Sequence, residues 1–248
     1  MRYAAVSALS HPGLLRERNE DSLVIGPWTL CATVTESSQT LVFPLGTPLV
    51  VAVADGLGGQ PGGDVASALV ARRMASIGPA LSGEDAVRDA LNACNRAVYE
   101  AGGGEGGDLA TMGTTVAGIV VQPDSLTVFN VGDSRVFAAA PDGLRQVSVD
   151  DSPPLEQGRH TTHLVTQCLG GTLAYRAVHP HVTTVPLSAG DRYLICTDGL
   201  TDPVPQHVLD EVIREHDDGR AAFELWKAAI AAAGPDNVTL AVVRVADT

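Results

Sequence analysis

Hydrophobic positions along the chain fall into two kinds of segment. Short apolar runs bounded by glycine, proline or aspartate predict β-strands, and longer stretches with apolar residues three or four positions apart predict helices. The predicted strands cover residues 3–9, 23–25, 49–54, 114–121, 125–131, 135–140, 144–147, 182–186, 192–197 and 238–245. The predicted helices cover residues 64–77, 82–102, 208–216 and 221–233.

The order of these segments indicates the fold class. Strands come in runs joined by short turns and helices come in pairs, which is not the strand–helix alternation of a doubly wound parallel sheet. We therefore predict an α+β fold, with antiparallel sheets covered by helix pairs. A chain of 248 residues is within the range of one domain, so we expect a single domain over residues 1–248. Residues 26–48 are harder to assign: a surface hairpin insertion is the preferred interpretation, and an irregular insertion or a partner-binding extension is the alternative.

The amino-acid composition limits the kinds of molecule that the protein can bind. Sixteen basic and 29 acidic residues give a net charge of -13, which argues against binding to nucleic acid or to anionic membrane surfaces. An anionic substrate would need a local reversal of that field, and bound cations supply one. No apolar run reaches the roughly 18 residues of a membrane span. The four cysteines have no CxxC spacing, so we expect reduced thiols in a cytoplasmic protein.

Three acidic residues share one local setting at the end of a predicted buried strand. Asp55 follows LVVAVA, Asp198 follows YLICT, and Asp236 comes just before VTLAVV. If these strand ends meet at one rim, the carboxylates would repel each other and raise each other's pKa. Hard divalent cations such as Mg²⁺ or Mn²⁺ remove that repulsion and prefer oxygen ligands. Gly56 lets the backbone approach closely, so its carbonyl could also face a metal.

Each of these residues is a weak signal alone. An Asp-Gly pair after a strand is usually a plain turn, and Asp142-Gly143 is interpreted that way. The segment 16–21, RERNED, adds two acids that follow arginines. Arginine near a metal pair is a good bidentate ligand for phosphate, although a charged surface turn would have the same composition.

Six short motifs stand in order along nearly the whole chain, from about residue 7 to 245. They are GLLRERNEDS at 13–22, ADGLGG at 54–59, GTT at 113–115, GDSR at 132–135, TDGL at 197–200 and DNVT at 236–239. Together they resemble the motifs of the metal-dependent protein phosphatases of type 2C, including the ADGMGG element of its bacterial members. The resemblance implies a central antiparallel β-sandwich with helix pairs outside, in α-β-β-α layers.

The same resemblance implies a role for each matching residue. Asp55 would bridge two metals and, with Arg16 and Asp198, form the catalytic set, in which Arg16 binds the substrate phosphate. The implied metal ligands are Glu20, Asp21, Asp55, Gly56, Asp198 and Asp236. Asp133 and Asp202 are candidates for a third metal. For Asp133 the alternative is a turn residue paired with Arg135.

The implied activity is hydrolysis of phosphoserine and phosphothreonine in proteins, with Mn²⁺ or Mg²⁺ as cofactor. Water or hydroxide between the metals would attack phosphorus in line. The implied partners are a phosphorylated protein and a bacterial serine/threonine kinase whose action the enzyme reverses.

Three departures from the family pattern leave an alternative open. Leu57 stands where eukaryotic relatives have a histidine, and Gln60 where many bacterial relatives have one. His160 and His163 could in principle approach the site instead. The flap at 150–164 is short, and residues 26–48 are longer than in compact relatives. The alternative hypothesis is a pseudophosphatase that binds phosphoproteins as a regulatory module.

Overall fold

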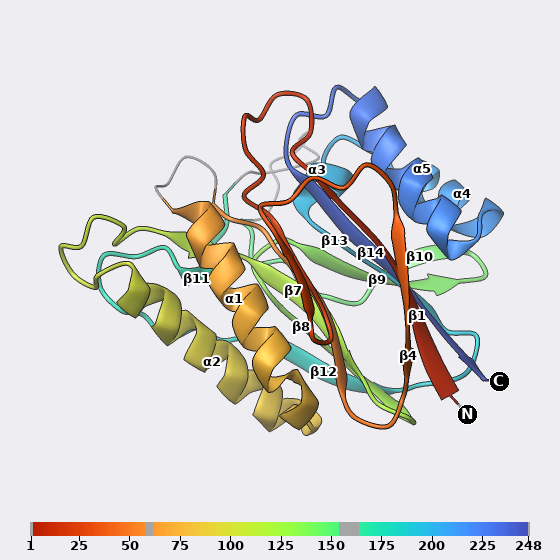
Figure 1. Ribbon diagram of the computed structural model, residues 1–248, viewed down its shortest axis with the longest axis horizontal. Coiled ribbons are helices and arrows are strands. Elements are labelled where there is room, and N and C mark those ends of the chain that lie inside the picture. The colour runs from red at the N-terminus through yellow and green to blue at the C-terminus, as the bar shows by residue number, and fades with distance from the viewer. Residues whose placement is uncertain (1, 58–61, 154–163, 248) are drawn as a thin grey trace.

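Two six-stranded antiparallel sheets face each other in the computed structural model, and a helix pair covers the outer face of each (Figure 1). The structure describes residues 2–57, 62–153 and 164–247. The first sheet has the order β10 (Gly143–Gln146), β9 (Arg135–Ala140), β13 (Arg192–Cys196), β14 (Val238–Asp247), β1 (Arg2–His11) and β4 (Gln39–Pro44). The second has the order β12 (His181–Pro186), β8 (Ser125–Val131), β7 (Val116–Val121), β5 (Leu49–Ala54), β2 (Ser22–Ile25) and β3 (Trp28–Cys31).

The helices lie where the sequence predicts them. Helices α1 (Gly63–Ile77) and α2 (Gly83–Ala101) pack on the second sheet, and α4 (Gln206–Glu215) and α5 (Asp218–Ala231) pack on the first. Shorter elements are the 3₁₀ turn η1 (Gly78–Ala80), the helical turn α3 (Asp198–Thr201), and a two-stranded pair of β6 (Gly113–Thr114) with β11 (Leu169–Gly170). None of the helices in the described part of the chain combines the length and apolar character needed to cross a membrane.

The hydrophobic core has three layers, one between the two sheets and one between each sheet and its helix pair. This explains why the central strands are unbroken apolar runs in the sequence. In β5, Val51 and Val53 pack between the two sheets, while Val50 and Ala52 pack against α1 and α2. A strand that is buried on both faces has no polar alternation, because neither side meets water. The predicted α+β class and sandwich are therefore confirmed.

Two local predictions were wrong. The strand predicted over 114–121 is divided at Thr115 into β6, which pairs with β11, and β7, which pairs with β5 and β8. Residues 26–48 do not form a hairpin insertion, since their two strands join different sheets: β3 pairs with β2 and β4 pairs with β1. The segment thus extends one edge of each sheet. The rest of the single-domain prediction is untested.

Candidate metal centre

The acidic residues at three strand ends meet at one pocket. Asp55 follows β5, Asp198 begins α3 two residues after the end of β13, and Asp236 lies just before β14. These three line a pocket of about 390 Å³ together with Arg16, Glu20, Gly56, Leu57, Thr115, Asp133, Val165, Gly199, Asp202, Pro203, Pro235 and Asn237. The sequence-predicted residues Arg16, Glu20, Asp133 and Asp202 are therefore brought to the same place. Asp21 is not part of the lining and lies fully buried.

Close backbone packing explains the glycines that follow two of the aspartates. A Cβ on Gly56 would lie 2.5 Å from the backbone of Gly63 and 2.7 Å from the carbonyl oxygen of Glu20. A Cβ on Gly199 would lie 1.9 Å from the carbonyl oxygen of Asn237. Only glycine fits at such separations. The Asp-Gly pairs thus permit the segments that carry the acids to pack directly on each other.

Asn237 is a positioning residue that sequence reasoning did not single out. Its side-chain amide donates to the carbonyls of Pro12 (3.0 Å) and Arg18 (2.8 Å), and its Oδ1 accepts from the N–H of Glu20 (2.7 Å). These contacts fix the loop that carries Arg16 and Glu20 against the start of β14. The available signal was the asparagine's place beside Asp236.

Burial and mutual repulsion raise the pKa values of the acidic cluster. The pKa of Asp55 is raised well above its usual value by burial, and further by the nearby charges of Asp21 and Asp198. Burial raises the pKa of Asp21 to about 7, with Asp198 and Asp236 adding to the effect. Burial, with Asp198, likewise raises the pKa of Asp133 to about 7. Ionising these carboxyl groups in the folded protein therefore costs free energy, and a bound cation would offset that cost.

The donor chemistry fits hard divalent cations. Asp21 is fully buried, its Oδ2 accepts a hydrogen bond from Thr197 Oγ1 (3.0 Å), and its Oδ1 has no hydrogen-bond partner among the described residues. Such an oxygen is costly to bury without a partner. All candidate ligands are oxygens, which suit Mg²⁺ and Mn²⁺.

Part of the acidic cluster is engaged in an ion pair. Within residues 2–57, 62–153 and 164–247, no three acidic, histidine or cysteine side chains form a ready metal-binding group. Asp236 Oδ2 instead accepts from Arg16 Nη2 at 2.7 Å.

Asp133 does not have the partner that the alternative hypothesis gave it. Arg135 Nη2 pairs with Asp150 Oδ2 at 2.7 Å, so the alternative of a turn residue paired with Arg135 is wrong. Leu57 lies in the pocket wall, where it offers no proton donor. Gln60, His160 and His163 lie outside the described residues.

Comparison with known proteins decides the family. A sequence model described as protein phosphatase 2C matches residues 40–234. The chain belongs to the protein phosphatase 2C family. The resemblance inferred from the six motifs is thereby confirmed.

Two similar proteins are named as serine/threonine phosphatases. The chain is 33% identical over 258 aligned residues to the serine/threonine protein phosphatase PstP of Mycobacterium tuberculosis, covering 100% of this chain and 45% of that protein. It therefore spans about half the length of this curated relative. It is 28% identical to the serine/threonine phosphatase Stp of Listeria monocytogenes, over 78% of this chain and 83% of that protein.

Solved structures of this family have the same fold. The catalytic domain of PstP in complex with two manganese ions matches with a TM-score of 0.79 at 31% identity, covering 100% of both chains. The M. tuberculosis PstP structure matches with a TM-score of 0.80 at 28% identity, over 99% of this chain and 100% of that one.

Proposed function

We propose that this chain is a metal-dependent protein serine/threonine phosphatase that hydrolyses phosphoserine and phosphothreonine in proteins. The observation that carries the proposal is the convergence of Asp55, Asp198 and Asp236 on one pocket with Arg16 at its side. The names of PstP and Stp, and the two manganese ions in the PstP catalytic domain, support it. The pseudophosphatase alternative has no support.

The ligand set of the proposal uses the acids around the pocket. Asp55, Asp198 and Asp236 would hold two divalent cations with the Gly56 carbonyl, Glu20 and Asp21, and Asp133 with Asp202 would hold a third. When bound, Mn²⁺ or Mg²⁺ lowers the pKa of bound water and stabilises negative charge on phosphoryl oxygens. Burial and the nearby carboxylates raise the pKa of Asp55, and bound cations would offset both effects.

Arg16 is proposed to bind and orient the substrate phosphate. Its side chain is 43% exposed and its Nη2 lies 2.7 Å from Asp236 Oδ2, so it can reach both the pocket and solvent. A guanidinium presents two parallel N–H donors to a phosphate, which fixes orientation as well as position. Leu57 cannot donate a proton, so the leaving oxygen must be protonated from elsewhere.

The net charge of -13 makes the local cations essential for substrate entry. A phosphoprotein approaching this surface meets a repulsive field, which Arg16 and bound cations would reverse near the pocket. We propose a cytoplasmic role that opposes a bacterial serine/threonine kinase.

Metal dependence tests the proposed function. The purified protein is expected to hydrolyse p-nitrophenyl phosphate and a phosphothreonine peptide with Mn²⁺ or Mg²⁺, and to lose both activities in EDTA. Release of inorganic phosphate measures the rate, and restoring Mn²⁺ should restore it. Folded, metal-loaded protein without turnover of either substrate would refute the phosphatase proposal.

Substitution of Arg16 should weaken substrate binding more than it slows turnover of bound substrate. We expect Arg16→Ala to raise KM for a phosphothreonine peptide by roughly 10- to 100-fold, because a charge-assisted bidentate contact is lost. Arg16→Lys should recover only part of the loss, since an ammonium lacks the planar pair of donors.

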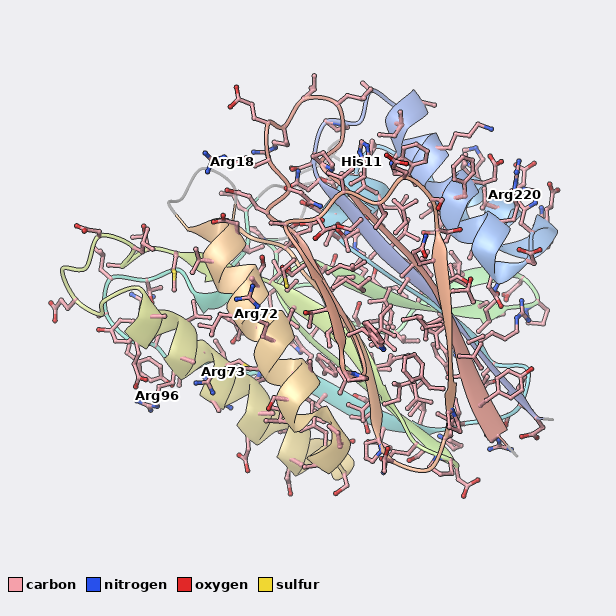
Figure 2. The ribbon with its side chains drawn as sticks, in the orientation of Figure 1. His11, Arg18, Arg72, Arg73, Arg96 and Arg220 are labelled. Atoms are coloured by element: carbon pink, nitrogen blue, oxygen red, sulfur yellow. The ribbon has the colours of Figure 1, made fainter. Side chains whose placement is uncertain are left out.

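Arg18→Ala is the matched control for Arg16. Arg18 lies two residues further along the same loop, points outward (Figure 2) and is not part of the pocket lining. Its structural contact is through the backbone carbonyl to Asn237, which alanine keeps. Equal increases in KM for the two variants would show that Arg16 acts only through the general charge of the loop.

A further inference from the structure

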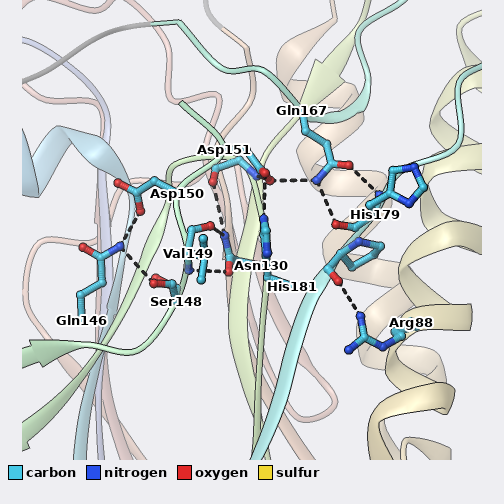
Figure 3. Close-up of polar contacts among 12 residues, drawn as sticks. Arg88, Asn130, Gln146, Ser148, Val149, Asp150, Asp151, Gln167, His179 and His181 are labelled. Atoms are coloured by element: carbon cyan, nitrogen blue, oxygen red, sulfur yellow. Dashed lines mark hydrogen bonds and ion pairs between the residues drawn. The ribbon is translucent and has the colours of Figure 1, made fainter. Parts of the chain in front are cut away.

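A cluster of hydrogen bonds centred on Asp151 adjoins the pocket and joins three segments to one carboxylate (Figure 3). Asp151 Oδ2 accepts from the N–H of Gly132 (2.9 Å) and from Gln167 Nε2 (2.9 Å), and Oδ1 lies 2.9 Å from His181 Nε2. The backbone of Asp151 donates to the carbonyl of Gly132 (2.9 Å) and accepts from the N–H of Thr166 (2.7 Å). Its side chain is only 12% exposed. One residue thus holds the β8–β9 turn, the segment before β11 and the start of β12.

The contact between Asp151 and the β8–β9 turn affects the pocket most directly, because this turn carries Asp133. Gly132 has φ +105°, and a Cβ there would lie 2.7 Å from the Cβ of Thr115. Both backbone hydrogen-bonding groups of Gly132 are bonded to Asp151. Asp133, the next residue, lines the pocket. The position of Asp133 is therefore fixed between Thr115 on one side and Asp151 on the other.

Hydrogen bonds continue from this turn to Asp55. Ser134 Oγ lies 2.7 Å from Thr115 Oγ1, which accepts from the N–H of Asp55 (3.2 Å). The N–H of Thr115 in turn donates to the carbonyl of Asp55 (2.9 Å). A displacement of the turn would therefore reach the residue at the centre of the acidic cluster.

Gln167 connects the other wall of the pocket to the same carboxylate. Besides its bond to Asp151, Gln167 Nε2 donates to the carbonyl of His179 (3.2 Å), and Gln167 Oε1 accepts from the N–H of His179 (2.6 Å). Thr166 is bonded to the carbonyl of Asp151, and Val165 before it lines the pocket. Asp133 and Val165 thus depend on one anchor.

We propose that Asp151 is a positioning residue for the reaction, which holds Asp133 and Val165 in register with Asp55 and so sets how a phosphorylated peptide is bound and turned over. The inference rests on the proposed phosphatase function. Asp151 does not line the pocket, so it acts through the residues that it holds. A purely architectural role would lower stability without a matching kinetic defect.

Two substitutions at Asp151 separate its hydrogen bonds from its charge. Asp151→Ala removes the acceptors for Gly132 and Gln167, and kcat/KM for a phosphothreonine peptide is expected to fall roughly 10- to 100-fold, since small misplacements of site residues are costly. In Asp151→Asn, the amide oxygen can still accept the hydrogen bonds from Gly132 and Gln167. The new NH₂ group can donate to His181 Nε2, provided that the imidazole is neutral and carries its proton on Nδ1. The asparagine variant should stay within about threefold of wild type.

Asp218→Ala is the control for a loss of stability alone. Asp218 is 14% exposed, pairs with Arg192 and Arg244 through contacts of 2.7 Å, and lies on α5 outside the pocket lining. It should lower the melting temperature without the fall in kcat/KM. The proposal is overturned if folded Asp151→Ala matches wild type, if Asp151→Asn loses as much as Asp151→Ala, or if Asp218→Ala shows the same kinetic loss.

Amide hydrogen exchange in metal-free protein gives a readout that needs no substrate. The N–H groups of Gly132 and Thr166 should exchange at least about tenfold faster in Asp151→Ala than in wild type or Asp151→Asn. If wild type itself hydrolyses nothing, the phosphatase proposal fails, and unchanged exchange would separately overturn the role of Asp151. If Asp151→Ala does not fold, Gln167→Ala removes one hydrogen bond to Asp151 together with the two to His179. It should raise KM, and an unchanged KM with faster exchange at Thr166 would overturn the proposal.

Discussion

Asp55→Asn is expected to abolish metal-dependent hydrolysis while stabilising the metal-free protein. Asn has nearly the same shape as Asp but carries no charge, so the proposed carboxylate ligand for the cations would be lost. We expect kcat/KM to fall by at least about a thousandfold. The same change removes a buried carboxylate whose pKa is raised by burial and by Asp21 and Asp198. The melting temperature in EDTA at pH 8 should therefore rise.

The opposite signs of these two effects are diagnostic, because a residue that only supports the fold would lose both activity and stability. Asp142→Asn is the control, since Asp142 lies in the turn between β9 and β10 and is not part of the pocket lining. It should change neither measurement. A fall in the metal-free melting temperature of Asp55→Asn would contradict the repulsion argument, and retained activity would contradict the ligand role.

Metal-free protein should lose stability as the pH rises from about 5 to 8, and Mn²⁺ should reverse the loss. Burial raises the pKa values of Asp21 and Asp133 from 3.8 to about 7 in the folded state. A raised carboxyl pKa means that the folded state binds the proton more tightly than the unfolded state. The contribution is therefore full below the unfolded pKa and is lost as the pH rises through about 7.

The raised pKa of Asp21 or Asp133 sets an upper limit on the loss of folding free energy between low and high pH. One pKa unit corresponds to about 1.4 kcal/mol, so a single carboxyl shifted by about three units would contribute roughly 4 kcal/mol at most. Urea unfolding in EDTA at pH 5.5 and pH 8, each repeated with Mn²⁺, measures it. Stabilisation by Mn²⁺ should be larger at pH 8, because the carboxylates there are ionised. A metal-free stability that is flat or rises between these pH values would refute the explanation.

Much of the fold could be predicted because its determinants are local. The run LVVAVA gave β5 with its observed bounds, and the apolar spacing in 64–77 gave α1 to within a residue. The edge strands β3 and β4 were not separated, because edge strands are half exposed and their sequence has no clear period. Which sheet such a strand joins depends on partners far away in sequence, as the pairing of β4 with β1 shows.

Some residues of the candidate site could also be predicted from the sequence, and others could not. Asp55, Asp198 and Asp236 could be singled out because each combines an acidic residue with a strand end, and their shared motif order added weight. The roles of Asn237 and Asp151 could not be predicted, since each acts through hydrogen bonds to backbone groups of distant segments. The only local signal was the place of Asn237 beside Asp236, and nothing in the sequence around Asp151 distinguishes it from an aspartate in a surface turn.

The sequence by itself therefore determined the α+β class, the family and the identity of the acids, because periodicity and ordered motifs are properties of the chain. Only the tertiary structure decided that these acids share one pocket, that Arg16 pairs with Asp236, and that Arg135 pairs with Asp150. Pairing is decided by three-dimensional distance, and burial in a common site is what raises the pKa values of Asp21 and Asp55. Both follow from the packing of segments up to 220 residues apart, as for Arg16 and Asp236, and no local pattern records such a contact.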